Sequence, residues 1–154
     1  MTTPPEFWQG VEEFNQREFY ACHDTLEAIW LEAPELDKRF YQGVLQVAVG
    51  CYHLSNYNWR GAVMLLGEAV KRLCDYRPIY HGIDVESLLQ QSNNLLQALQ
   101  RIEPEGVAEF WQQLQNKPLE VPEPTSGNLE MADSENYNFT YGSSLPYVLR
   151  KNQA

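Results

Sequence analysis

The chain has 154 residues, 44% hydrophobic and 21% charged, a composition typical of one soluble globular domain with a sizeable core. Its formal net charge is −10 and its basic residues form no cluster, so repulsion from phosphate groups argues against nucleic-acid binding. The sequence has no apolar run long enough to span a bilayer and no recognisable secretory signal, which predicts a cytoplasmic protein without a membrane partner.

Three amphipathic helices are predicted in the amino-terminal part of the chain. The first is opened by Pro4 and Pro5 and ends near Asn15, and the second begins near Phe19 and stops before Pro34. The third covers residues 37–54, with Asp37 in the position of an N-cap.

Three further helices are predicted downstream. The fourth begins near Trp59 and ends before Pro78, and the fifth is capped by Asp84. A short sixth helix starts at Pro104. Residues 80–83 between the fourth and fifth helices are predicted to be a loop, with His81 as a solvated turn residue.

No strand pattern competes with these helices before the tail, so the fold class is predicted to be an all-α bundle of five or six mostly antiparallel helices. Segments 14–30 and 57–73 resemble each other, as two helical hairpins of a tetratricopeptide-like repeat would, although the signature positions of that repeat are not met. A chance likeness between two hairpins is the other interpretation.

Composition changes after Lys117, which divides the chain into a helical domain of residues 1–117 and a second region of residues 118–154. Residues 118–135 are acidic and contain three prolines, as in an extended linker, whereas residues 136–150 regain aromatic and aliphatic side chains. This pattern predicts an extended carboxy-terminal tail that docks on its own domain or mediates self-association by docking on a neighbour.

The three cysteines lie in helical patterns and show no metal-binding or redox spacing. Cys22, Cys51 and Cys74 are therefore predicted to be small buried side chains rather than reactive thiols.

Polar residues placed inside two apolar helical patterns are the candidate site. His23 and Glu27 share one face of the second helix, with Trp30 near them, and Gln46 and His53 lie on one stripe of the third.

Glycines on the third helix suggest how these two stripes would meet. Gly43 and Gly50 share one face and weaken the helix, which indicates close approach of another helix. If that neighbour is the second helix, His23, Glu27, Gln46 and His53 converge in a buried cluster. Glu68 of the fourth helix is either a further carboxylate that faces this cluster or an ordinary carboxylate of a helix surface.

The same residues carry a resemblance to a known family. The pattern H-x3-E-x2-W-x9-F, followed by a glycine and a histidine, resembles a bacterial and archaeal family catalogued as a domain of unknown function. It is formed here by His23, Glu27, Trp30, Phe40, Gly43 and His53, and Phe14-Asn15 and residues 59–62 also fit. The resemblance covers roughly residues 7–100 and implies a small all-helical fold with no established activity.

Three interpretations of the cluster remain open. It is a paired polar network that fixes helix packing, or it orders an inter-helix groove that binds a protein or peptide, or it is a metal site. The groove interpretation predicts a binding or scaffold module without a cofactor. The alternative is a metal-dependent, hydrolase-like enzyme that holds a divalent ion with His23, Glu27 and His53.

Overall fold

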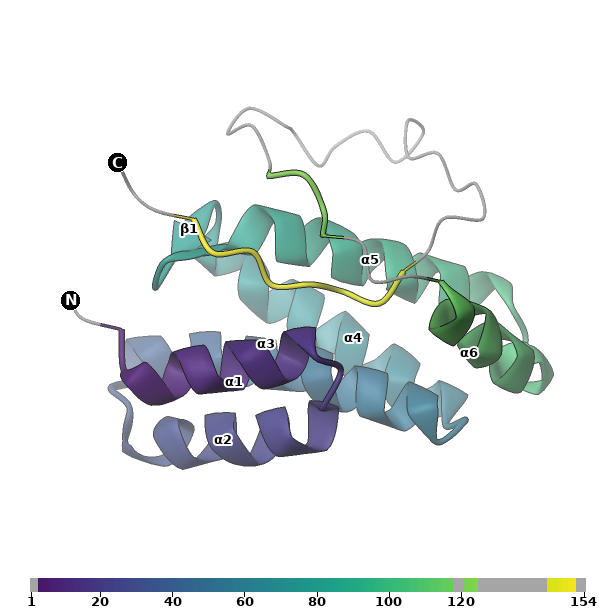
Figure 1. Ribbon diagram of the computed structural model, residues 1–154, viewed down its shortest axis with the longest axis horizontal. Helices are drawn as coiled ribbons and strands as arrows, with labels where there is room; N and C mark the ends of the chain where they lie inside the picture. The colour runs from purple at the N-terminus through teal and green to yellow at the C-terminus, as the bar shows by residue number, and fades with distance from the viewer. Residues whose placement is uncertain (1–2, 118–120, 125–143, 152–154) are drawn as a thin grey trace.

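A computed structural model describes residues 3–117, 121–124 and 144–151 (Figure 1). These residues form a bundle of α-helices with one small antiparallel hairpin, which confirms the predicted all-α fold class. In chain order the elements are α1 (Pro5–Asn15), α2 (Phe19–Glu32), α3 (Glu35–Ser55), α4 (Trp59–Leu73), η1 (Cys74–Tyr76), β1 (Ile79–Tyr80), β2 (Ile83–Asp84), α5 (Val85–Arg101), η2 (Pro104–Gly106) and α6 (Val107–Asn116). None of the helices in these described ranges is long and apolar enough to cross a membrane.

Helix ends follow the predicted capping signals with one exception. The Asp84 carboxylate accepts a 2.9 Å hydrogen bond from the backbone amide of Ser87, so the predicted cap of α5 is confirmed. The predicted cap of α3 is wrong, because α3 begins at Glu35 after Pro34. Asp37 lies inside the first turn of α3 and is buried there.

Two helical hairpins, α1–α2 and α3–α4, make up the first half of the molecule (Figure 1). A short turn joins the helices of each hairpin, and each turn contains one residue in the left-handed region, Arg17 (φ 65°) and Tyr57 (φ 60°). α3 runs through the centre and contacts both α2 and α4, and its residues Phe40, Val47 and Leu54 are fully buried.

The cysteines behave largely as predicted. Cys22 and Cys51 are buried and Cys74 is partly buried, and all three are free thiols. Burial raises the pKa of Cys51 to about 12 and also raises the pKa of Cys22, which keeps both thiols protonated and unreactive near neutral pH.

The predicted loop at 80–83 is wrong, because these residues belong to the β1–β2 hairpin. Ile79 pairs with Asp84 and Tyr80 with Ile83, and His81 and Gly82 form the turn. The side chain of His81 is 3% exposed, so its predicted solvation is also wrong.

The described part of the tail lies against the helical domain. Residues 144–151 run in extended form beside α5 and α1 (Figure 1, yellow). Leu145 and Val148 are 3% and 1% exposed. Of the predicted linker only residues 121–124 are described, and the tail before residue 144 lies outside the described residues.

Candidate functional site

His23 and Glu27 are neighbours on α2, but at the surface. Their Nε2 and Oε2 atoms are 3.4 Å apart, and the side chains are 31% and 49% exposed. The predicted burial of this pair is therefore wrong. Asp24 lies on the other side of the imidazole, with Oδ1 3.2 Å from Nδ1 of His23.

A series of ring contacts through two tyrosines connects His23 with His53. Ring centroids are 6.1 Å apart for His23 and Tyr20, 5.4 Å for Tyr20 and Tyr52, and 6.3 Å for Tyr52 and His53. The imidazoles thus flank a tyrosine pair. We call Tyr20, His23, Tyr52 and His53 the aromatic face.

Gln46 does not join this face. Its side chain donates a 2.8 Å hydrogen bond to Glu68 and accepts a 3.0 Å hydrogen bond from Arg72, both on α4. Glu68 therefore does contact one residue of the predicted cluster, Gln46. The network of Gln46, Glu68 and Arg72 lies between α3 and α4, however, and not between α2 and α3.

The glycines of α3 explain why the predicted convergence fails. A Cβ on Gly43 would lie 2.9 Å from the side chain of Leu73, and one on Gly50 would lie 3.0 Å from Leu66. Both leucines belong to α4. The close neighbour of this face is therefore α4 and not α2, so Gln46, which contacts α4, is separated from His23.

Trp30 is partly buried beside the core and does not donate to Glu27. Its indole Nε1 is buried without a hydrogen-bond partner among the described residues, and Lys38 Nζ lies 5.5 Å from its ring centre. The five predicted residues are thus distributed over the aromatic face, the α3–α4 network and the flank of α2.

A groove of about 470 Å³ adjoins the aromatic face. Residues from the α1–α2 turn, α2, α3 and α6 line it, among them Arg17, Tyr20, Tyr52, Ser55, Trp111 and Gln115. Tyr20 is 59% exposed and Tyr52 is 37% exposed, whereas Trp111 is buried. The groove borders α2 and α3, which carry the predicted site residues, and its third helix is α6.

Arg17 is a cationic residue that lines this groove. Its Nε atom is buried and has no hydrogen-bond partner among the described residues. A buried donor without an acceptor is unfavourable, and a carboxylate is the acceptor that a guanidinium pairs with best. The lining of the groove therefore combines aromatic walls with one cationic residue, Arg17, and one acidic residue, Glu18.

One group of potential metal ligands occurs among the described residues. His23, Asp24 and Glu27 each offer a ligand atom, and these atoms lie within 4.8 Å of one another. His53 is not part of the group, and its Nδ1 lies 3.2 Å from the side-chain nitrogen of Asn58.

The buried polar cluster of this protein is one that the sequence interpretation missed. Asp37 Oδ1 accepts a 2.6 Å hydrogen bond from the Tyr80 hydroxyl and lies 3.0 Å from Nε2 of His81. The Thr3 hydroxyl is 3.2 Å from Nδ1 of the same imidazole, and Tyr41 stacks on the ring at 5.7 Å. The Tyr80-His81-Gly82 run was the available signal, since a glycine turn can aim a histidine inward.

This cluster borders a cavity of about 570 Å³ but is internally satisfied. Both nitrogens of His81 have partners, and Tyr80 already donates to Asp37. Burial raises the pKa of Tyr80, helped by its hydrogen bond to Asp37, and raises that of Tyr41 to about 12. These groups fasten the β1–β2 hairpin to α3, and we interpret them as a structural latch.

Comparison with known proteins confirms the resemblance to a family of unknown function. Residues 7–65 match a family model described as a domain of unknown function (DUF309). The chain is also 30% identical over 95 residues to a Bacillus subtilis (strain 168) protein named "Uncharacterized protein YpuF". That match covers 60% of this chain and 55% of the relative, so the chain spans about half the length of the curated relative it matches. No solved structure matches the chain.

The family match covers one part of the fold. Residues 7–65 comprise most of α1, all of α2 and α3, and the beginning of α4, so the aromatic face lies inside the matched segment. The β1–β2 hairpin, α5, α6 and the tail lie outside it.

Proposed function

We propose that this chain is a binding module that takes a short segment of another protein in the groove beside the aromatic face. The proposed segment places an aromatic or large apolar side chain between Tyr20 and Trp111 and a carboxylate on Arg17. The observation that carries the proposal is a groove of about 470 Å³ whose lining combines the exposed Tyr20 and Tyr52 with the cationic Arg17.

The exposed tyrosines support the same proposal. Tyr20 and Tyr52 are in ring contact at 5.4 Å and keep 59% and 37% of their surface accessible. Tyrosine offers a large contact area at low entropic cost and is enriched at the centres of protein interfaces. A peptide across this pair would also lie beside the imidazoles of His23 and His53.

The test is selection of peptides that bind the full chain from a random display library. We expect enriched peptides to carry an aromatic or large apolar residue next to an aspartate, a glutamate or a free carboxy terminus. Converting that carboxylate to an amide should weaken binding roughly tenfold or more, because a charged hydrogen bond is lost. Isothermal titration calorimetry measures both forms.

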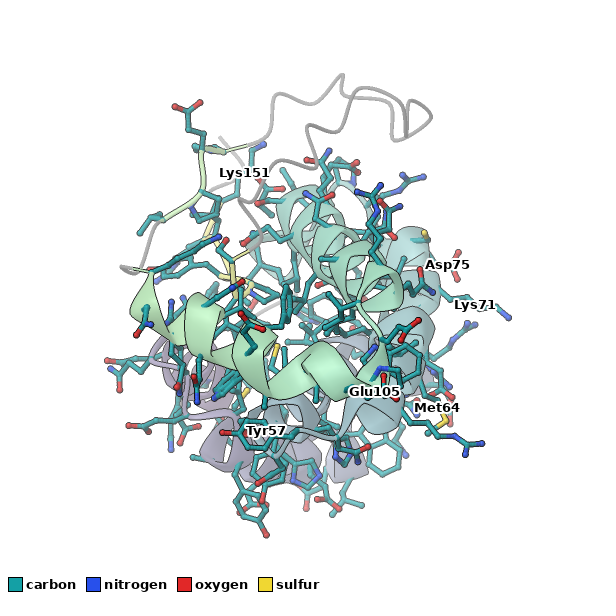
Figure 2. The ribbon with its side chains drawn as sticks, turned by 90° about the vertical axis from the view of Figure 1, so that its right-hand side faces the viewer. Tyr57, Met64, Lys71, Asp75, Glu105 and Lys151 are labelled. Atoms are coloured by element: carbon teal, nitrogen blue, oxygen red, sulfur yellow. The ribbon has the colours of Figure 1, made fainter. Side chains whose placement is uncertain are left out.

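Matched variants locate the binding site on the molecule. Tyr20→Ala with Tyr52→Ala, and separately Arg17→Gln, should each weaken binding of the selected peptide. Tyr57→Ala is the control, because Tyr57 is 50% exposed and does not line the groove, and it projects at the surface in Figure 2. Selection of the same peptides by the double tyrosine variant would refute the proposal.

A second candidate function is binding of a divalent metal ion by His23, Asp24 and Glu27. The observation in its favour is the convergence of their ligand atoms within 4.8 Å. An imidazole and two carboxylates with open positions form a ligand set that suits zinc or manganese and can activate water for hydrolysis.

Calorimetry of the untagged chain with zinc and with manganese tests this candidate. We expect one ion per chain, lost in His23→Ala and weakened in Glu27→Gln, with Glu35→Gln on α3 as an exposed carboxylate control. Equal binding by the wild type and His23→Ala would exclude the site.

A further inference from the structure

Two amide side chains make four hydrogen bonds to the backbone of the carboxy-terminal segment 144–151. The side-chain amide of Gln91 on α5 donates to the carbonyl of Tyr147 and accepts from its amide, both at 2.9 Å. Asn15, the last residue of α1, does the same for Val148, at 3.0 and 2.7 Å. One amide side chain from α1 and one from α5 therefore form hydrogen bonds to adjacent residues of an extended segment.

The segment also bonds to the edge of the β1–β2 hairpin. The amide of Asp84 donates to the carbonyl of Leu149, and the amide of Lys151 donates to the carbonyl of Gly82, both at 2.8 Å. Ile83 and Arg150 form an antiparallel bridge. Addition of an extended segment to a sheet edge is a general mode of peptide recognition, and its hydrogen bonds do not depend on the sequence of the segment.

Four side chains of the segment contact the domain. Leu145 and Val148 are buried in the domain. The guanidinium of Arg150 lies 4.1 Å from the ring centre of Trp8, and Lys151 Nζ is 3.8 Å from the buried carboxylate of Asp84. The surface between α1, β2 and α5 that holds this segment therefore accommodates two spaced apolar side chains followed by basic ones.

The polar groups that contact the segment also belong to the ordered framework of the domain. Gln91 also donates a 3.0 Å hydrogen bond to the hydroxyl of Ser87, one turn earlier on α5. Asn15 is fixed by its place at the end of α1, and Asp84 is fixed as the cap of α5. These positions belong to rigid elements, as expected of a binding site and not only of a packed chain end.

We propose that the channel between α1, β2 and α5 is a binding site for an extended peptide of another protein, and that residues 144–151 occupy it as a competing internal ligand. The occupant has the pattern of the segment itself, an apolar residue, an apolar residue three positions later and a basic residue two positions after that. This site is separate from the groove of the proposed function. Asn15, Asp84 and Gln91, which bond to the segment, do not line that groove.

The experiment uses the full chain with a protease site introduced within residues 125–143, studied uncut and after cutting. The probe is a fluorescent peptide with the sequence of residues 144–151, and anisotropy measures its binding. In the uncut chain the tethered segment competes at high effective concentration, so cutting should lower the apparent Kd at least roughly 100-fold.

Variants of Asn15 and Gln91 show whether their side-chain amides are needed for peptide binding. In the cut protein, Asn15→Ala and Gln91→Ala should each weaken probe binding about tenfold, because each removes a pair of hydrogen bonds. Gln100→Ala is the control, an exposed glutamine on the same helix that lies outside these contacts. A peptide with aspartate in place of Leu145 and Val148 should not bind.

Circular dichroism of the cut protein distinguishes two cases. Either the domain stays folded without residues 144–151, as a peptide-binding site would, or it needs them to fold. The body should remain helical and unfold cooperatively after its own segment has been displaced. If it loses helicity when the segment leaves, the segment is a fixed part of the core and the proposal is overturned. Equal probe binding by cut and uncut protein would also overturn it. A concentration-dependent dimer of the uncut chain that Asn15→Ala abolishes would overturn it, since the occupant would then be a second copy of this chain and not another protein.

Discussion

The two helical hairpins, α1–α2 and α3–α4, repeat the same turn with a shift of 40 positions along the chain. In the first, the amide of Glu18 donates to the carbonyl of Glu13 at 2.9 Å, and in the second, that of Asn58 donates to His53 at 2.9 Å. Arg17 and Tyr57 occupy the same left-handed position in the two turns.

The helix contacts repeat with the same shift. A Cβ on Gly10 would lie 2.9 Å from the side chain of Leu26, and one on Gly50 would lie 3.0 Å from Leu66. Each hairpin therefore packs a buried leucine of its second helix on a glycine of its first. The sequence comparison of 14–30 with 57–73 places these hairpins three positions out of register.

The hairpins differ where their repeated part ends. α3 has additional amino-terminal turns that α1 lacks, and these carry Asp37 of the latch. The second hairpin also has a side-chain cap, Asn58, whereas Glu18 makes no cap hydrogen bond in the first. The repeated contacts hold the helices together, and the residues outside the repeat supply the features particular to this chain.

Removing the latch carboxylate should give the largest change. We expect Asp37→Ala to lower the free energy of unfolding by about 3 kcal/mol, because it leaves His81 and the Tyr80 hydroxyl buried without their partner. Urea unfolding followed by circular dichroism measures the loss. Asp75→Ala removes an exposed carboxylate and should change stability by less than about 0.5 kcal/mol. Equal effects of the two variants would contradict the latch.

The repeated leucines should respond alike. Leu26→Ala and Leu66→Ala each remove a fully buried side chain that contacts a glycine, and each should cost about 3 kcal/mol. Urea unfolding of the two single variants provides the comparison. A loss confined to Leu66→Ala would show that the first hairpin is not held by the contact that the second one uses.

The sequence predicts the helices well because their signals are local. Paired prolines at the start of α1, Asp84 before α5 and the apolar spacing within each helix act over a few residues. The position of Gly43 and Gly50 also predicts a close neighbour correctly. Which helix is that neighbour depends on the tertiary arrangement. Because the neighbour is α4 and not α2, Gln46 does not meet His23.

The latch could not be predicted for a related reason. Asp37 and His81 are far apart in the chain, and each has an ordinary local interpretation, one as a helix cap and the other as a turn residue. Only the packing of the β1–β2 hairpin on α3 brings them to 3.0 Å. His23 and Glu27 show the opposite case, since their spacing correctly predicts contact but does not determine burial.

The buried cysteines allow the hairpins to be compared at alkaline pH. Cys22 in the first corresponds in position to Ala62, and Cys51 in the second corresponds to Val11. Burial raises the pKa of Cys51 to about 12 from its ordinary value of 9.0 and also raises that of Cys22. The unfolded chain therefore loses these protons first, so stability is complete below pH 9 and falls as the pH rises toward 12.

Each thiol should contribute a loss of roughly 1 kcal/mol between pH 7 and pH 10. Cys22→Ala and Cys51→Val, which copy the corresponding residue of the other hairpin, should each reduce the measured loss, and the double variant should reduce it further. Urea unfolding at the two pH values gives the difference, in which any constant packing effect of the substitution cancels. An unchanged difference in the double variant would show that the thiols do not titrate on unfolding.

The capping residues should give the smallest effect and test why the hairpins differ. Asn58→Ala should cost about 1 kcal/mol, because Asn58 accepts a hydrogen bond from the amide of Gly61. The reverse change, Glu18→Asn, should gain no more than a few tenths of a kcal/mol. A Cβ on Gly61 would lie 2.6 Å from the side-chain nitrogen of Asn58, and the first hairpin has Ala21 at that position. The cap therefore depends on the glycine, and thermal unfolding of both variants tests this. A gain from Glu18→Asn as large as the loss from Asn58→Ala would show that Ala21 does not prevent the cap.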